Sequence, residues 1–171
     1  LPEAEGLVRR RVASGTRNLC VEPAMTLVEA RRAVETGIQM AEEAAADGCN
    51  LLGFGEMGIG NTTSASALAA ALTGLPVAVV TGRGAGADDD CLSRKTSAVE
   101  RALALHAGRL SDPLEMLACL GGLEIAAMCG FCLGAAAHRI PVLTDGFIAT
   151  AGAALAVGLH PSVADYLFAS H

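Results

Sequence analysis

The sequence predicts an α/β protein with one parallel sheet that helices cover on both faces. Two short, continuously apolar runs, residues 50–54 and 140–144, indicate buried strands, and helical patterns alternate with them. Such runs are typical of parallel sheets, because both faces of each strand are buried. At 171 residues, the chain is long enough for a single domain with a sizeable core.

The first predicted helix follows an irregular, basic segment over residues 1–23. Thr26 and Glu29 form a capping box, and apolar residues then recur in steps of three and four. Gly48 ends this helix, and the first strand follows directly. The pattern therefore predicts an amphipathic helix packed against the sheet.

A glycine-rich loop joins the first strand to the second predicted helix. This helix covers residues 64–72, with Asn61 as its expected N-cap and Gly74 as its C-terminal stop. Residues 76–81 then predict a further strand, because they are rich in β-branched side chains.

Four more helices are predicted in the second half of the chain. One covers residues 91–106, and the next begins at Asp112 with a proline in its first position and ends at Gly121. Helices over 123–137 and 147–157 lie on either side of the second strand. Both are nearly uncharged but shorter than the roughly 20 apolar residues of a membrane span, so we expect them in the core.

Composition argues against several classes of function. The formal net charge of −6 and the pI near 5.1 argue against nucleic acid as a partner, because phosphate backbones select basic surfaces. The six cysteines lie in apolar surroundings, which favours reduced thiols. Cys129 and Cys132 form a C-x-x-C pair without a second pair or nearby histidines, so buried core thiols are favoured over a redox or metal site.

The glycine-rich loop over residues 53–63 is the strongest functional signal. A strand, a glycine loop and a helix start direct several backbone N–H groups at one spot, where the helix dipole favours negative charge. Glu56 lies inside this loop, which indicates an anionic substrate whose reacting centre becomes positive. We expect this phosphate or carboxylate to be bound by Gly58, Ile59, Gly60, Asn61, Thr62 and Thr63.

Two other interpretations of this loop compete with an anion site. Its glycines match the spacing of a dinucleotide-binding fingerprint, but no acid occurs between Glu56 and Asp88, where that fingerprint needs a ribose ligand. Nicotinamide-dinucleotide binding is therefore disfavoured. A tight strand-to-helix turn without a ligand stays open as the second interpretation.

Asp145 and Lys95 are further candidates. Asp145 follows the second strand, so it and Glu56 both occupy carboxyl ends of strands, where sites form in parallel sheets. The alternative for Asp145 is an N-cap of the following helix. Lys95 follows the acids at 88–90, and from the residues alone a surface ion pair with them is favoured.

Taken together, these motifs resemble one enzyme family along nearly the whole chain, the nicotinate-nucleotide–dimethylbenzimidazole phosphoribosyltransferases of cobalamin synthesis. The most specific matches are Lys95 and residues 9–18, 55–63, 82–86, 121–126 and 140–147. A combination of this length is far more specific than any one glycine motif.

The resemblance implies a large, Rossmann-like α/β domain in a cytoplasmic homodimer, with small-molecule substrates and no cofactor or metal. It implies transfer of the 5-phosphoribosyl group from nicotinate mononucleotide to 5,6-dimethylbenzimidazole, giving α-ribazole 5′-phosphate and nicotinate. It implies catalytic roles for Glu56, Lys95 and Asp145. It also implies that the loop residues 58–63 bind the phosphate or ribose, and it adds Gly84 to them. It also suggests that residues 76–80 form a short helix.

Two departures from the family are expected to limit activity. The family's general base is a glutamate in a late glycine-rich segment, and the sequence ends at His171, before any such segment. The N-terminal part that shapes the base pocket is missing as well. We therefore expect residues 1–171 to be a single α/β domain, a segment of a larger enzyme that is weakly active alone. A non-catalytic nucleotide- or phosphate-binding module is the alternative.

Overall fold

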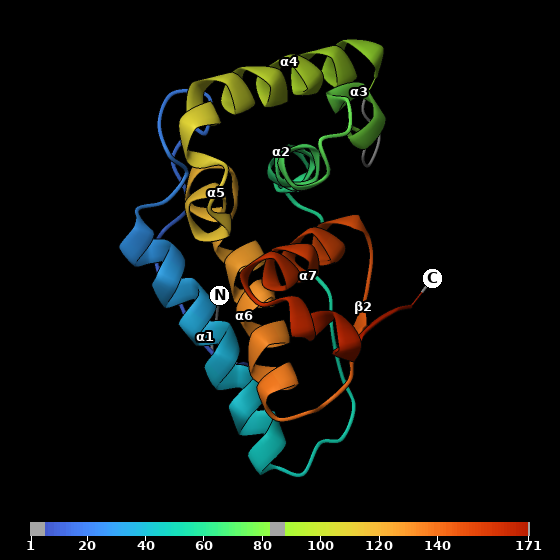
Figure 1. Ribbon diagram of the computed structural model, residues 1–171. Coiled ribbons are helices and arrows are strands. Elements are labelled where there is room, and N and C mark those ends of the chain that lie inside the picture. Colours follow the sequence, from blue (N-terminus) through green and yellow to red (C-terminus); the bar gives the residue numbers. More distant parts are fainter. Residues whose placement is uncertain (1–5, 83–87, 171) are drawn as a thin grey trace.

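The protein consists of a three-stranded parallel sheet packed against helices (Figure 1). The structure is a computed structural model, which describes residues 6–82 and 88–170. The strands, in spatial order, are β1 (Leu52–Phe54), β2 (Val142–Thr144) and β3 (Leu167–Ala169). The α/β class and the parallel sheet predicted from the sequence are confirmed.

The helices begin and end close to the predicted residues. They are α1 (Leu27–Ala46), α2 (Thr62–Thr73), α3 (Val77–Val80), α4 (Asp89–His106), α5 (Pro113–Leu120), α6 (Leu123–Ala137) and α7 (Phe147–Leu159), with 3-10 turns at Ala107–Arg109 and Pro161–Tyr166. No helix in the described ranges has the length and apolar character needed to cross a membrane.

The prediction of a strand over residues 76–81 is wrong, because this segment forms the single helical turn α3. Thr81 donates its backbone N–H to the carbonyl of Val77, and Val80 accepts a hydrogen bond from the Ser66 hydroxyl of α2 (3.0 Å). The backbone N–H and carbonyl groups that a strand would pair with a neighbouring strand thus form hydrogen bonds within α3 and with Ser66 of α2. The short helix suggested by the family resemblance is confirmed.

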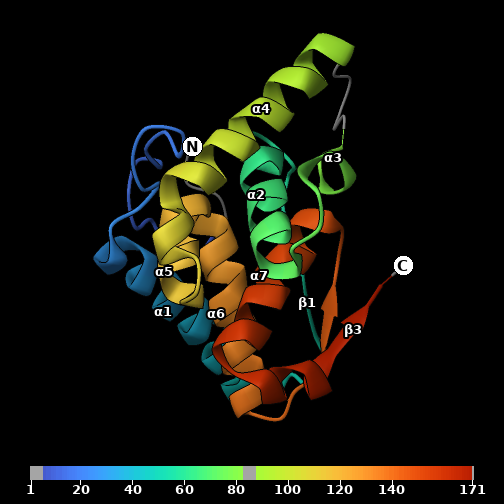
Figure 2. The same cartoon turned by 45° about the horizontal axis from the view of Figure 1, so that its top comes forward.

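The sheet packs one face against the helices and exposes the middle row of the other. Leu52 and Val142 are buried, whereas Leu143 and Phe168 are 39% and 53% exposed. Gly53, Leu143 and Phe168 are aligned across the three strands, so an apolar row is open in the described chain. Helices α1, α6 and α7 lie on one side of the sheet in both views (Figures 1 and 2), so the predicted cover on the second face does not come from them.

Helices α1 and α6 pack closely against each other in the core. A Cβ atom at Gly37 would lie 1.8 Å from the carbonyl oxygen of Ala127, and one at Gly130 would lie 1.9 Å from that of Val34. Only hydrogen fits at these two crossing points, because real Cβ contacts are much longer. The two helices are therefore held at a distance that glycine alone permits.

The C-x-x-C pair belongs to this core. Cys129 and Cys132 are both fully buried on α6. Burial raises the pKa of the Cys129 thiol and raises the pKa of Cys132 to about 12, so both remain protonated near neutral pH. The prediction that these two cysteines are buried core residues is confirmed.

Candidate functional site

The pairing of β1 with β2 places Asp145 beside the loop that contains Glu56, although Asp145 does not line either of the two cavities described below. Phe54 pairs with Thr144, so the residues that follow each strand leave the sheet side by side. A Cβ atom at Gly55 would lie 3.1 Å from Oδ2 of Asp145, which shows how closely this carboxylate approaches the loop. Asp145 is not a helix cap, because the N-cap of α7 is Gly146.

The Glu56 carboxylate is fixed by its own loop. The backbone N–H of Gly58 donates to Oε2 (2.5 Å), and Nδ2 of Asn61 donates to the same oxygen (2.6 Å). Gly58 has φ of +70°, a left-handed conformation that lets the loop fold back over Glu56. One N–H group expected to bind an external anion is thus used to hold the acid.

Asn61 occupies the predicted N-cap position of α2 but does not cap the helix. Its side chain accepts no capping hydrogen bond, because its amide is turned toward Glu56. The first intrahelical bond of this helix runs from the Ala65 N–H to the Asn61 carbonyl. The backbone N–H groups of Thr62 and Thr63 precede that bond, so they have no partner within the helix and can bind an anion.

Lys95 of α4 extends to Gly82, the first residue of the glycine-rich segment 82–86. Its Nζ donates to the carbonyl oxygen of Gly82 (3.0 Å). Gly82 in turn lines a cavity together with Glu56 and Thr62, so Lys95 contacts one residue of the cavity wall without lining the cavity itself. Gly84, the remaining predicted site residue, lies outside the described residues.

That cavity has a volume of about 570 Å³ and is mainly apolar. Val79 of α3 and Phe147 of α7 supply apolar wall, while Glu56 and Thr62 contribute polar groups. A cavity of this composition fits a ligand with an apolar ring and a few polar substituents.

A second cavity of about 500 Å³ lies against the other part of the glycine loop. Its wall combines Gly15 and Thr16 of the N-terminal segment with Glu56 and with Glu124 from the first turn of α6. Glu56 therefore lines both cavities. Gly15, Thr16 and Glu124 were not predicted as site residues, although each belongs to a segment that matches the family.

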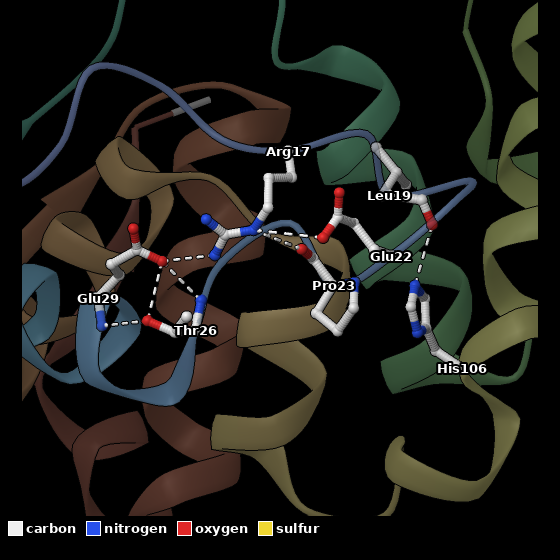
Figure 3. Close-up of polar contacts among 7 residues, drawn as sticks. All are labelled: Arg17, Leu19, Glu22, Pro23, Thr26, Glu29 and His106. Carbon is white, nitrogen blue, oxygen red and sulfur yellow. Dashed lines mark hydrogen bonds and ion pairs between the residues drawn. The ribbon is translucent and has the colours of Figure 1, made fainter.

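The N-terminal segment is held in place by an ion-pair network around Arg17 (Figure 3). Nη2 of Arg17 contacts Oε2 of Glu29 at 2.6 Å, and the Thr26 N–H donates to the same oxygen at 2.7 Å. The hydrogen bond from Arg17, followed by those from Thr26, lowers the pKa of Glu29 to about 2. The predicted capping box thus also anchors the residue that follows Gly15 and Thr16.

Further contacts tie this segment to α4 and α5. The Arg17 N–H donates to the Ala24 carbonyl, and the Ala24 N–H donates to the carbonyl of Cys119. Figure 3 shows His106 of α4 pointing at the segment, with Nε2 at 2.9 Å from the Leu19 carbonyl oxygen. The wall of the second cavity is therefore fixed to three helices.

The described residues offer no resident metal site. No group of three or more histidine, cysteine, aspartate or glutamate side chains is placed to hold an ion within residues 6–82 and 88–170.

Comparisons with known proteins identify relatives along the entire chain. A family model described as a phosphoribosyltransferase matches residues 2–171. The nicotinate-nucleotide–dimethylbenzimidazole phosphoribosyltransferase of Geobacter sulfurreducens is 53% identical over 169 residues, which are 99% of this chain and 48% of the relative. The protein of the same name from Roseiflexus sp. is 51% identical over 171 residues, again 48% of its length.

A solved structure shows the same fold. The crystal structure of CobT from Thermus thermophilus matches with a TM-score of 0.94 and 49% identity, covering 100% of this chain and 51% of that chain. The chain thus spans about half the length of the curated relatives it matches.

Proposed function

Because the chain belongs to the phosphoribosyltransferase family, we propose that the natural protein carrying it transfers the 5-phosphoribosyl group from nicotinate mononucleotide to 5,6-dimethylbenzimidazole. The products are α-ribazole 5′-phosphate and nicotinate. The observation that carries this proposal is the Glu56 carboxylate, which is fixed by its loop and lines two cavities large enough for two substrates.

In the proposed reaction, Glu56 and Asp145 stabilise positive charge on the ribose. The bond between the anomeric carbon and the nicotinate nitrogen breaks, and nicotinate leaves with the electron pair. The lone pair of the unprotonated benzimidazole nitrogen forms the new bond, and the proton of the other ring nitrogen passes to a general base that the family resemblance places outside residues 1–171. Carboxylates held in advance near the anomeric carbon lower the barrier, because they need no reorganisation as charge develops.

The phosphate is proposed to bind at the start of α2. The N–H groups and hydroxyls of Thr62 and Thr63 offer donors there, and Lys95 supplies the balancing charge. Of the other residues expected to bind phosphate or ribose, we keep Ile59, Gly60 and Gly84. Gly58 and Asn61 are instead proposed to support the site indirectly, because their donors already contact Glu56. We also propose that the natural protein is a cytoplasmic homodimer, which the family resemblance supports.

The decisive experiment is a Glu56→Gln substitution in the natural protein that carries this sequence. We expect turnover to fall by about 100-fold with a much smaller change in the KM for nicotinate mononucleotide, because the charge acts mainly in the transition state. Product formation is followed by chromatography of α-ribazole 5′-phosphate. Glu42→Gln, an exposed acid on α1, is the matched control and should retain full activity.

Either of two results would contradict this assignment. Unchanged turnover in Glu56→Gln removes Glu56 from the mechanism. A wild-type protein that binds nicotinate mononucleotide but forms no product favours the alternative, a non-catalytic nucleotide-binding module.

A further inference from the structure

We propose that Asn61 is a positioning residue that holds the Glu56 carboxylate in its catalytic orientation, an inference that rests on the function proposed above. Asn61 is 7% exposed, and its Nδ2 donates to Oε2 of Glu56 at 2.6 Å. This role differs from the helix cap predicted by residue type and from direct contact with a substrate.

The orientation of the Asn61 amide is set by Glu56. Oδ1 of Asn61 is buried without a hydrogen-bond partner among the residues that the structure describes. A rotated amide would place this oxygen against the Glu56 carboxylate, where two acceptors repel each other. One buried acceptor is therefore left unsatisfied while the donor is directed at the acid. The charge-assisted hydrogen bond to the carboxylate offsets this cost and holds Glu56 in position.

The two donors act on the same carboxylate oxygen. The Gly58 N–H and the Asn61 amide both contact Oε2, and neither of them occupies Oε1. Because Glu56 lines both cavities and only its Oε2 is held by these two donors, its other oxygen is left for a substrate in either cavity. Asn61 stands at the start of α2, so the helix serves as the rigid support of this arrangement.

The first test compares Asn61→Ala and Asn61→Asp with the wild-type natural protein. Both variants should lower kcat by about tenfold or more while the KM for nicotinate mononucleotide changes by less than about twofold. Asn61→Asp is the informative variant, because it keeps the volume but replaces the donor with a negative charge. A kcat near the wild-type value for Asn61→Asp overturns the proposal, because this variant cannot donate to Glu56 as the amide does.

A double-variant cycle separates action through Glu56 from independent action. If Asn61 acts through Glu56, then Asn61→Ala combined with Glu56→Gln is no slower than Glu56→Gln alone. Additive losses, or a raised KM with unchanged kcat, show that Asn61 contacts the substrate itself and overturn the proposal. Thr73→Ala, in the last turn of the same helix, is the control for general effects on α2.

Crystal structures of the wild-type and Asn61→Ala proteins supply a measurement that needs no turnover. We expect Glu56 to leave the Gly58 N–H, or to occupy several rotamers, in the variant only. An unmoved Glu56 overturns the positioning role even if the enzyme is active. Absence of turnover in the wild type would instead overturn the proposed function and leave this structural test intact.

Discussion

At the scale of single residues, the site depends on groups that hold other groups. Glu56 is fixed by Gly58 and Asn61, and Asp145 lies against the backbone of Gly55. Gly15 and Thr16 line the cavity of about 500 Å³, and the ion pair of Arg17 with Glu29 anchors the segment that contains them. The candidate side chains are therefore accompanied by neighbours that fix their positions.

The Arg17–Glu29 pair predicts a specific pH dependence of stability. The folded-state pKa of Glu29 is about 2, below its ordinary value of 4.5, so the pair stabilises the fold fully above pH 4.5 and loses this contribution as pH falls toward 2. We expect the free energy of unfolding lost in Glu29→Gln to be largest near neutral pH and to shrink below pH 4.5. Urea titrations of both proteins across this range measure it. A difference that stays constant as the pH approaches 2 contradicts the prediction.

The sequence predicted the location of a site residue where its position after a strand determines that location. It failed where a side chain has two possible hydrogen-bond partners. Glu56 and Asp145 follow apolar runs directly, so their place at the carboxyl ends of β1 and β2 could be foreseen. Asn61 could not, because a capping amide and an amide that binds a carboxylate have the same residue type at the same position. Gly15 and Thr16 carried no signal besides the family match, since their place in a cavity wall depends on long-range contacts.

At the scale of elements, α1 and α6 are the framework on which the site segments rest. Their crossing is close because Gly37 and Gly130 have no side chains at the contact points. The neighbouring thiols of Cys129 and Cys132 fill space in the same core. The position of Glu124 at the start of α6 therefore depends on a contact farther along the same helix.

Gly130→Ala should destabilise the natural protein by about 3 kcal/mol, because a backbone carbonyl 1.9 Å from the new Cβ atom cannot move aside without separating the helices. Chemical denaturation monitored by circular dichroism measures the loss. Gly108→Ala is the matched control, since no heavy atom lies within 4 Å of its Cβ position, and it should change stability little. Equal stability of the two variants would contradict the close crossing.

Element boundaries were predictable wherever local chemistry marks them. The Thr26 capping box and the Asp112 N-cap, with its following proline, marked helix starts within one residue of those observed. Residues 76–81 were misassigned because β-branched composition outweighed the absence of a partner strand. Strand β3 was not predicted, since three residues after a 3-10 turn are too short for a periodic signal.

At the scale of the whole molecule, the chain combines a helix start rich in N–H donors with two acids but spans only half the length of its relatives. The family resemblance indicated this arrangement from sequence, because its motifs cover nearly every segment of the chain. Composition and periodicity could not predict which residues line the two cavities or that Glu56 lines both, because this depends on contacts between segments far apart in the sequence.

Residues 1–171 are expected to bind nicotinate mononucleotide without converting it at an ordinary enzyme's rate. Isothermal calorimetry should give micromolar or tighter binding, weakened by about tenfold in Lys95→Ala, because a charged donor to the anion is lost. Arg101→Ala, an exposed cation on the same helix, should bind like the wild type. No binding would show that further segments are needed to complete the site, and full turnover would refute the expected dependence on an external base.

The open row of Gly53, Leu143 and Phe168 has a practical meaning for such experiments. An exposed apolar row on a short sheet promotes association with other molecules, and the edge strands of such a sheet can pair with strands of another chain. Self-association of residues 1–171 alone would accordingly report on the sheet face that the described residues leave open. The quaternary state that matters for catalysis is the one measured on the natural protein, with light scattering run beside every binding titration of the segment.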